Sequence, residues 1–253
     1  MKRVFTTISL ALVALVACNK AEEPVAAEQQ GSVSISCNVT SEVEDTRAEV
    51  SCTLPAIDEF SLTIDGISQD YHAEYASVAE FQESYLHSGS YKASVKAGDL
   101  NVEGYDCATF EGEAEFTVVS RQHTDVEVTA TIANSLVKVE VTEDFKSYFA
   151  GGYEFTLKTE LGNEYDVTEQ SDYLFVAPTS IEILATATKQ PNESGAEGKV
   201  VTLPTERIEN LKPRTTYVVK FDVSTAGEAT LQITLNDSLV EERNIDNELN
   251  QYA

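Results

Sequence analysis

VEVTATIANSLVKVEV, residues 126–141, holds two runs in which apolar and polar residues alternate, separated by Ala133, Asn134 and Ser135. Successive side chains of a β-strand point to opposite faces, so each run predicts a strand with one face in a core and the other in water. Such half-solvated strands are typical of antiparallel sheets, because parallel sheets are usually buried on both faces. The polar pair Asn134-Ser135 predicts a domain boundary between the two strands.

The same alternation recurs on both sides of this stretch. In SVSISCNVT, residues 32–40, one face carries Val33, Ile35, Cys37 and Val39. Helical signals are few and short: a capping box at Ser77–Glu80, and one turn that opens at Thr142 and ends near Gly151. We therefore predict an all-β chain with two consecutive antiparallel β-sandwich domains, at residues 31–134 and 135–253. Further alternating runs lie at residues 60–64, 91–95, 217–223 and 231–235.

The N-terminus has the pattern of a secretory signal peptide. Lys2 and Arg3 precede an apolar run from Val4 to Val16, which is shorter than the roughly 20 residues that span a bilayer. The run ends in Leu-Val-Ala-Cys, which resembles a bacterial lipobox, so we expect residues 1–17 to be removed and Cys18 to be lipidated. The alternative is an ordinary signal peptide with a chance cysteine.

Residues 18–30 are expected to form a flexible tether, because NKAEEPVAAEQQ has no apolar period and contains a proline. Asn19–Glu23 also resembles the lysine-plus-acidic signals that send lipoproteins of the Bacteroidota to the outer face of the outer membrane. A merely polar tether is the alternative. Together, anchor and tether predict an outer-membrane, surface-exposed protein that contacts the membrane through its lipid.

The charge balance argues against nucleic acid as a partner. The whole chain has a net charge of −26, and loss of Lys2 and Arg3 with the signal peptide makes the mature chain about −28. A polyanion of this density repels phosphate backbones and anionic membrane surfaces.

The order of motifs resembles the Bacteroidota lipoproteins of domain-of-unknown-function family 4493. The resemblance rests on LHSGSYKASVKAGDL (86–100), on the segment GYDCATFEGEAEFTVV…SYF (104–149) and on LKPRTTYVVKFDV…NDSL (211–239). It covers nearly the whole mature chain, and the layout is similar to fimbrillin-like and adhesin-like proteins with transthyretin- or immunoglobulin-like sandwiches. It implies a non-catalytic role in adhesion, fimbria-like assembly or scaffolding, with other surface or fimbrial proteins as partners.

The resemblance also draws attention to Arg47 and Ala48, in the loop SEVEDTRAEVS. In polymerising fimbrillins a protease cuts after an arginine that follows the first strand, and a neighbouring subunit fills the groove by strand addition. The alternative is a solvated arginine that moderates an acidic loop.

The remaining cysteines favour no metal site. Cys37 and Cys52 fall in the apolar phase of their segments, so each is expected to be a small buried hydrophobe, while an oxidising exterior also allows a disulfide between them. No CxxC pair is present, and His72, His87 and His123 lack ligand spacing. We expect no metal and no cofactor.

The sequence contains no G-x-S-x-G, H-E-x-x-H, P-loop or dinucleotide motif, so we expect no enzymatic activity. Glycan binding is the alternative function, because Tyr71, Tyr75, Tyr85 and Tyr105 lie in less regular segments, although the chain has no tryptophan. Asp237-Ser238-Leu239 matches a short O-glycosylation pattern, with Ser238 as acceptor, and such short patterns also arise by chance.

Overall fold

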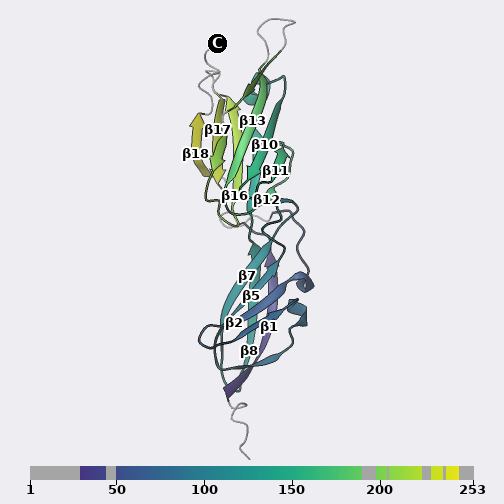
Figure 1. The fold of residues 1–253 in the computed structure, drawn as a ribbon, viewed down its shortest axis with the longest axis vertical. Helices are drawn as coiled ribbons and strands as arrows, with labels where there is room; N and C mark the ends of the chain where they lie inside the picture. The colour runs from purple at the N-terminus through teal and green to yellow at the C-terminus, as the bar shows by residue number, and fades with distance from the viewer. Residues whose placement is uncertain are drawn as a thin grey trace, which may run out of the picture.

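The computed structural model describes residues 29–43, 50–189, 198–203, 205–223, 229–235 and 238–244, with side chains up to residue 223. Figure 1 shows a long molecule in which two β-rich halves follow each other end to end. Nearly all the described secondary structure is strand, and the single α-helix in it, α1, covers only Glu143–Tyr148. The prediction of an all-β fold is confirmed.

The first half is built on a seven-stranded sheet with the strand order β3-β2-β5-β7-β8-β1-β4. β7 and β8 pair only at one end, through Phe110–Ile132 and Glu111–Thr131. Beyond that point they separate, so that β3-β2-β5-β7 and β8-β1-β4 become the two layers of a sandwich. The strands are β1 (Gln30–Thr40), β2 (Ser61–Gly66), β3 (His72–Tyr75), β4 (Ser84–His87), β5 (Gly89–Ala97), β7 (Phe110–Val118) and β8 (His123–Ile132).

A glycine makes this corner of the sheet possible. A Cβ atom at Gly112, in β7, would collide with the carbonyl oxygen of Thr129 in β8. The two backbones can therefore approach closely only where no side chain is present.

The alternating apolar residues fill the space between the layers. Val33, Val128 and Ala130 are fully buried, and Val126 and Ile132 nearly so. They join one hydrophobic cluster with residues of the facing layer, including Phe60, Leu62, Ile64, Tyr91, Val95 and Phe110.

The second half packs two sheets against each other. One has the order β11-β10-β13-β14, with β15 also paired to β13, and the other has the order β18-β17-β16-β9-β12-β6. Their facing side chains form a second cluster, which includes Val137, Val139, Phe155, Leu157 and Phe221. The strands are β6 (Gly104–Tyr105), β9 (Ser135–Val141), β10 (Tyr153–Thr159), β11 (Glu164–Val167), β12 (Leu174–Val176), β13 (Ile181–Lys189), β14 (Lys199–Thr202), β15 (Glu206–Ile208), β16 (Thr216–Val223), β17 (Ala229–Leu235) and β18 (Ser238–Asn244).

Among the described strands, two pairs depart from the antiparallel pattern. β1 runs parallel to β8, and β9 runs parallel to β16. The alternation in the sequence specifies which face of a strand is buried but not the direction of its neighbour, so these pairings could not be predicted from it. The same arrangement in both halves indicates that the two sandwiches share a topology.

A short connection does lie at the predicted boundary, because β8 ends at Ile132, β9 begins at Ser135, and only Ala133 and Asn134 lie between them. We propose domains at residues 31–134 and 135–253, supported by the two separate hydrophobic clusters. Leu136 and Phe175 cross this division, since both pack in the first cluster.

Both predicted helix starts are confirmed, but the capping box predicted at Ser77–Glu80 is not formed. Ser77 caps the short 3₁₀ helix η3 (Val78–Glu80) by accepting a hydrogen bond from the Ala79 amide at 3.0 Å. Thr142 caps α1 by accepting a hydrogen bond from the Phe145 amide at 3.2 Å. A second 3₁₀ helix, η2 (Ile57–Glu59), was not predicted.

Candidate functional site

The first strand, β1, is inserted between two others. It pairs parallel to β8 over nine residues, from Ser32 to Thr40, and antiparallel to β4 from Gln30 to Val33. As the alternation predicted, Val33 lies in the core, and Ile35, Cys37 and Val39 pack against it half-buried. β1 is therefore an integral part of the first sandwich, although it is the first strand of the described chain.

A polar cluster on the outer face joins β1 to its neighbours. The Nδ1 atom of His123 lies 2.8 Å from Ser32 Oγ and 3.4 Å from Glu83 Oε1, and its Nε2 atom lies 3.0 Å from Asp125 Oδ1. Ser34 Oγ donates a hydrogen bond to the same Asp125 oxygen. The hydrogen bond from Ser34, and then that from His123, hold the pKa of Asp125 below its usual value.

No short sequence motif marks this cluster, because its histidine has no other histidine or cysteine at close spacing in the sequence. Ser32 and His123 are far apart along the chain and meet only through the parallel pairing of β1 with β8. The one available signal was that both sit in the polar phase of their strands. The side chains of His123, Glu83 and Asp125 are exposed, and Ser32 and Ser34 are half-buried.

The segment after β1 is fixed at both ends. Ser41 and Val43 are buried, as is Val50 farther along, and the Val50 amide donates a hydrogen bond to the Ser41 carbonyl at 3.1 Å. Arg214, from the second half, donates from Nε to the Glu42 carbonyl at 2.8 Å. Arg47 and Ala48 themselves lie outside the described residues, and so does Cys18.

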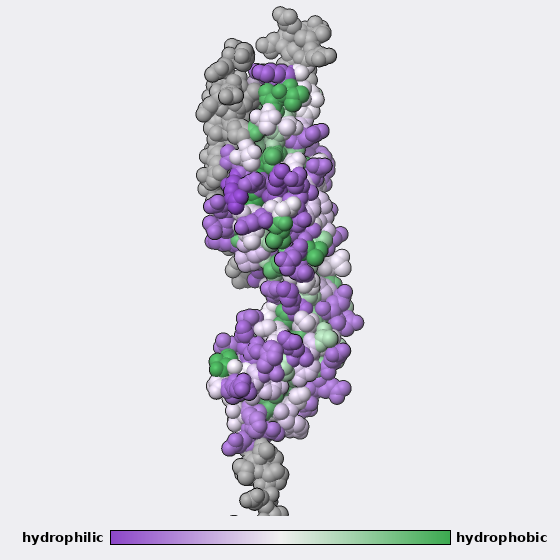
Figure 2. All heavy atoms as spheres, viewed as in Figure 1, coloured by the Kyte–Doolittle hydropathy of each residue, from purple (hydrophilic) through white to green (hydrophobic). Residues whose placement is uncertain are grey.

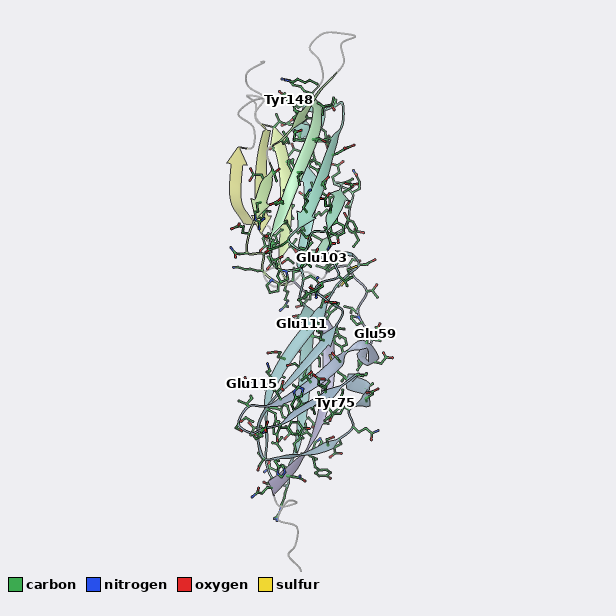
Figure 3. The ribbon with its side chains drawn as sticks, viewed as in Figure 1. Glu59, Tyr75, Glu103, Glu111, Glu115 and Tyr148 are labelled. Carbon is green, nitrogen blue, oxygen red and sulfur yellow. The ribbon has the colours of Figure 1, made fainter. Side chains whose placement is uncertain are left out.

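Glu103 connects the two halves at the waist of the molecule (Figure 3). The residue is 8% exposed, and its carboxylate accepts three hydrogen bonds from the second half: from Thr159 Oγ1 at 2.5 Å, from Asn163 Nδ2 at 2.8 Å and from the Ala177 amide at 2.9 Å. The next two residues form β6, which pairs with β12 at the edge of a sheet in the second half. A loop of the first half is thus built into the second.

Asn134 stiffens the same waist from the predicted boundary. Its side-chain oxygen accepts a hydrogen bond from the Thr109 amide at 2.6 Å, and its carbonyl accepts one from the Arg214 amide at 2.8 Å. Ser135 Oγ donates to the Lys212 carbonyl at 2.7 Å. The polar pair that marks the boundary in the sequence therefore bonds to residues on both sides of it.

The other predicted site residues are scattered. Cys37 and Cys52 carry free thiols that pack against the first core, and burial raises the pKa of each. A disulfide between them stays a prediction. Ser238 is the first residue of β18, but its side chain lies outside the described set.

The four tyrosines that the sequence suggested for glycan binding do not form one aromatic surface. Tyr71 and Tyr75 are half-buried against the first core, where Tyr71 meets Tyr91 edge-to-face and Tyr75 meets Phe81 in the same way. Tyr85 is 68% exposed on β4, and Tyr105 lies on β6 at the waist.

Three general features concern metal sites, membrane-spanning helices and the polarity of the surface. Within the described residues, no three or more His, Cys, Asp or Glu side chains are grouped so that they could hold a metal ion. No helix in that part of the chain is long and apolar enough to span a membrane. Figure 2 shows a visible face covered mainly by hydrophilic side chains, with hydrophobic ones scattered among them.

Several solved structures of bacterial proteins resemble the chain at low identity. A fimbrial assembly protein from Parabacteroides distasonis is 11% identical, with a TM-score of 0.45, over 82% of this chain and 99% of that one. A candidate cell adhesion protein from Bacteroides eggerthii is 10% identical, with a TM-score of 0.44, over 84% and 97%. A candidate polysaccharide-binding protein from Bacteroides thetaiotaomicron is 11% identical, with a TM-score of 0.39, over 88% and 100%. At these TM-scores, none of the three assigns a role to this chain.

The family comparison is more specific. A search of curated proteins finds no match. The model of the family described as Domain of unknown function (DUF4493) matches residues 29–251, which includes both sandwiches and the waist between them. The chain therefore belongs to this family.

Proposed function

We propose that the protein is a non-catalytic, lipid-anchored module of the cell surface that serves adhesion, fimbria-like assembly or scaffolding. One observation carries this proposal: the described chain starts at the tip of the first half, while the second half lies at the far end of the long molecule (Figure 1). Cys18 lies 12 residues before Gln30. A lipid there would hold the first half near the membrane and project the second half away from it.

The waist supports such a projecting role. A protein that displays its far end must resist bending between its halves. The three hydrogen bonds of Glu103, the pairing of β6 with β12 and the contact of Arg214 with Glu42 all cross between the halves. Because several independent contacts must break together, hinge motion is opposed.

The anchor is tested by the substitution Cys18→Ser. We expect the variant to be folded and to leave the membrane fraction, with Cys37→Ser as the control that stays bound. In the native host, externally added protease should degrade the unmodified protein on intact cells. If the Cys18→Ser variant still sedimented with membranes after a high-salt wash, a protein-mediated attachment would replace the lipid anchor.

For the assembly role, we propose that cleavage after Arg47 releases β1. Loss of β1 would expose the core around Val33 and leave unpaired backbone on β4 and β8, which had been its two neighbours. An open groove of this kind attracts a strand from another chain.

An arginine-specific protease tests this step. We expect the cut protein to form an ordered ladder or filaments, and Arg47→Lys to prevent this, whereas Arg121→Lys, at an exposed turn, should not. If the cut protein keeps β1 and remains monomeric, assembly by strand release is excluded, while anchoring at Cys18 is unaffected.

Glycan capture is a second candidate function. It is favoured by a cavity in the second half, of about 360 Å³, whose lining combines aromatic, carboxylate, amide and hydroxyl groups. The four tyrosines named from the sequence do not favour it, because their rings are dispersed.

A further inference from the structure

The cavity that favours glycan capture lies where β10 and β11 separate. The last paired residues of these strands at this end are Phe155 and Val167. β10 continues beside β13, with Tyr153 opposite Ala187. The segment that follows β11 turns away from β10 through residues 168–171. That turn is held by a hydrogen bond from the Ser171 amide to the Thr168 carbonyl at 3.0 Å. The opening left between the strands is the cavity, lined by residues 153–155 and 166–170.

Tyr153 gives the cavity a rigid aromatic wall. Its ring meets Phe145 edge-to-face, with centroids 5.6 Å apart, and lies 5.5 Å from Phe155. Two buried aromatic neighbours hold the half-buried ring in place, so little conformational freedom is lost when a ligand packs on it. Burial, and then the nearby Glu169 carboxylate, raise the pKa of Tyr153, which keeps its hydroxyl a neutral donor.

Glu169 and Gln170 form a fixed polar rim. Lys146 binds Glu169 Oε2 at 2.8 Å, and the Gln170 amide donates to Glu169 Oε1 at 2.6 Å. Lys146, from α1, also binds Glu143 Oε1 at 2.9 Å, so Glu169 shares this cation with a second carboxylate. The side-chain amide of Gln170 can form further hydrogen bonds, and these are what the rim offers a ligand.

Glu154 and Asp166 complete the rim as exposed acceptors. Neither side chain has a hydrogen bond or an ion pair with any other residue in the described part of the chain. Thr168 adds a hydroxyl, which shares a 3.1 Å hydrogen bond with Ser171 Oγ. The lining of the cavity therefore includes hydrogen-bond acceptors and donors as well as an aromatic ring.

We propose that this cavity binds a neutral saccharide, with an apolar face of a sugar ring against Tyr153 and its hydroxyls bonded to Asp166, Glu154 and Gln170. The proposal rests on the glycan-capture candidate and gives it a site. Small-molecule pockets of about 300–1,000 Å³ combine apolar walls with a few convergent polar groups, and at about 360 Å³ this one suits one or two sugar rings.

Other ligand classes fit less well. An anionic ligand would face the carboxylates of Glu154 and Asp166 in a chain of net charge −26. An ammonium compound would satisfy those carboxylates but would leave the donors of Gln170 and Tyr153 without an acceptor. A hydroxyl both donates and accepts, so it matches the whole rim.

The test is titration of the full-length protein, in a detergent without sugar groups, with lactose, cellobiose, maltose and N,N′-diacetylchitobiose, followed by ligand-observed NMR and calorimetry. We expect at least one disaccharide to bind at millimolar concentration. Tyr153→Ala should weaken it by about tenfold or more, which corresponds to about 1.4 kcal/mol. Tyr153→Phe, which keeps the ring, should retain most of the affinity.

Asp166→Asn and Glu154→Gln are surface substitutions that leave the core intact, so a loss of binding in them cannot be attributed to unfolding. The matched control is Tyr85→Ala, which removes the most exposed of the four tyrosines in the other half. Three outcomes would overturn the proposal: no binding of any disaccharide, loss of binding in the Tyr85→Ala variant only, or binding of spermidine in place of the sugars. None of them affects the membrane-release test of Cys18→Ser, so failure of this site and failure of the surface-anchor proposal are distinguishable.

Discussion

Glu103 illustrates how much a single residue does at the waist. It is nearly buried and has no cationic partner among the described residues, yet all three of its hydrogen bonds come from the second half. A buried carboxylate is costly unless its lone pairs are satisfied, and here two side chains and one backbone amide satisfy them. The residue therefore stabilises the junction only while both halves are in place.

We predict that Glu103→Ala lowers the free energy of unfolding on the order of 2 kcal/mol, because three donors lose a charged acceptor. The free energy of unfolding of Glu103→Gln should lie between the values for Glu103→Ala and the unmodified protein, since glutamine keeps one acceptor oxygen. Urea denaturation followed by circular dichroism measures both. Glu115→Ala, which is exposed on β7 away from the waist (Figure 3), is the control and should change the stability by less than about 0.5 kcal/mol. Equal effects of Glu103→Ala and Glu115→Ala would contradict the role given to Glu103.

His72 is expected to show a pH dependence of its own. Its Nδ1 atom lies 2.7 Å from Asp65 and its Nε2 atom 3.3 Å from Glu74. The hydrogen bond with Asp65 is the largest cause that raises the pKa of His72 above its usual value. The protonated form is thus favoured in the folded state, so its stabilising contribution is complete below about pH 6.5 and is lost as the pH rises through the folded-state pKa.

An NMR titration of the His72 ring measures this directly. We expect a midpoint above about 6.5, a clear decrease in Asp65→Asn and a smaller decrease in Glu74→Gln, whose contact is longer. A midpoint that is unchanged in Asp65→Asn would show that the contact does not persist in solution.

At the scale of the element, β1 is held more by strand pairing than by core contacts. Its core contacts are modest, since only Val33 among its large side chains is fully buried. Nine parallel pairs with β8, four antiparallel pairs with β4 and the His123 cluster hold it instead. A strand held mainly by pairing can be replaced by another strand of similar pattern, which is what assembly by strand release requires.

Helix α1 offers a test of capping in an element one and a half turns long. Thr142 Oγ1 accepts from the Phe145 amide and donates to Asp222 at 2.6 Å, so it fixes α1 to β16. Thr142→Ala should lower the free energy of unfolding by about 1 kcal/mol, the usual cost of losing an N-cap. Thr142→Ser should restore most of it, because the hydroxyl is kept. Urea denaturation is again the measurement, and equal stabilities of the alanine and serine variants would exclude the cap as the cause.

The whole molecule is long because its two sandwiches share little surface. Each half has its own hydrophobic cluster, and the contacts that cross the waist are mainly polar, apart from Leu136 and Phe175. Polar, directional contacts fix an angle between two bodies more strictly than an apolar surface does, because each hydrogen bond is lost after a small displacement. The shape is therefore expected to persist in solution.

Small-angle X-ray scattering should give a radius of gyration above the roughly 17 Å of a compact chain of the same length as residues 29–253. The unmodified protein should fit a single rigid shape, whereas Glu103→Ala combined with Arg214→Ala should broaden the distance distribution. Far-UV circular dichroism of both proteins should remain strand-rich, with helix well below the roughly one third of ordinary domains. A compact scattering profile would contradict the end-to-end arrangement.

The period-two pattern was enough, by itself, to predict the all-β class and the strands β1, β2, β5, β8, β9, β16 and β17 with a short connection near Asn134-Ser135, but it did not predict the other strands. Short-range rules were likewise enough for the caps at Ser77 and Thr142. These features depend on residues only a few positions apart. A local pattern of this kind is compatible with few local structures, so it is enough to predict them.

Only the tertiary structure decided which strands are neighbours. The parallel pairing of β1 with β8 brings Ser32 to His123, the loop after β5 carries Glu103 into the second half, and the separation of β10 from β11 opens the cavity beside Tyr153. Each of these joins residues from distant parts of the chain. Alternation specifies that a strand has a buried face but not which strand lies beside it, so the clusters, the waist and the cavity arise from packing that no local pattern encodes.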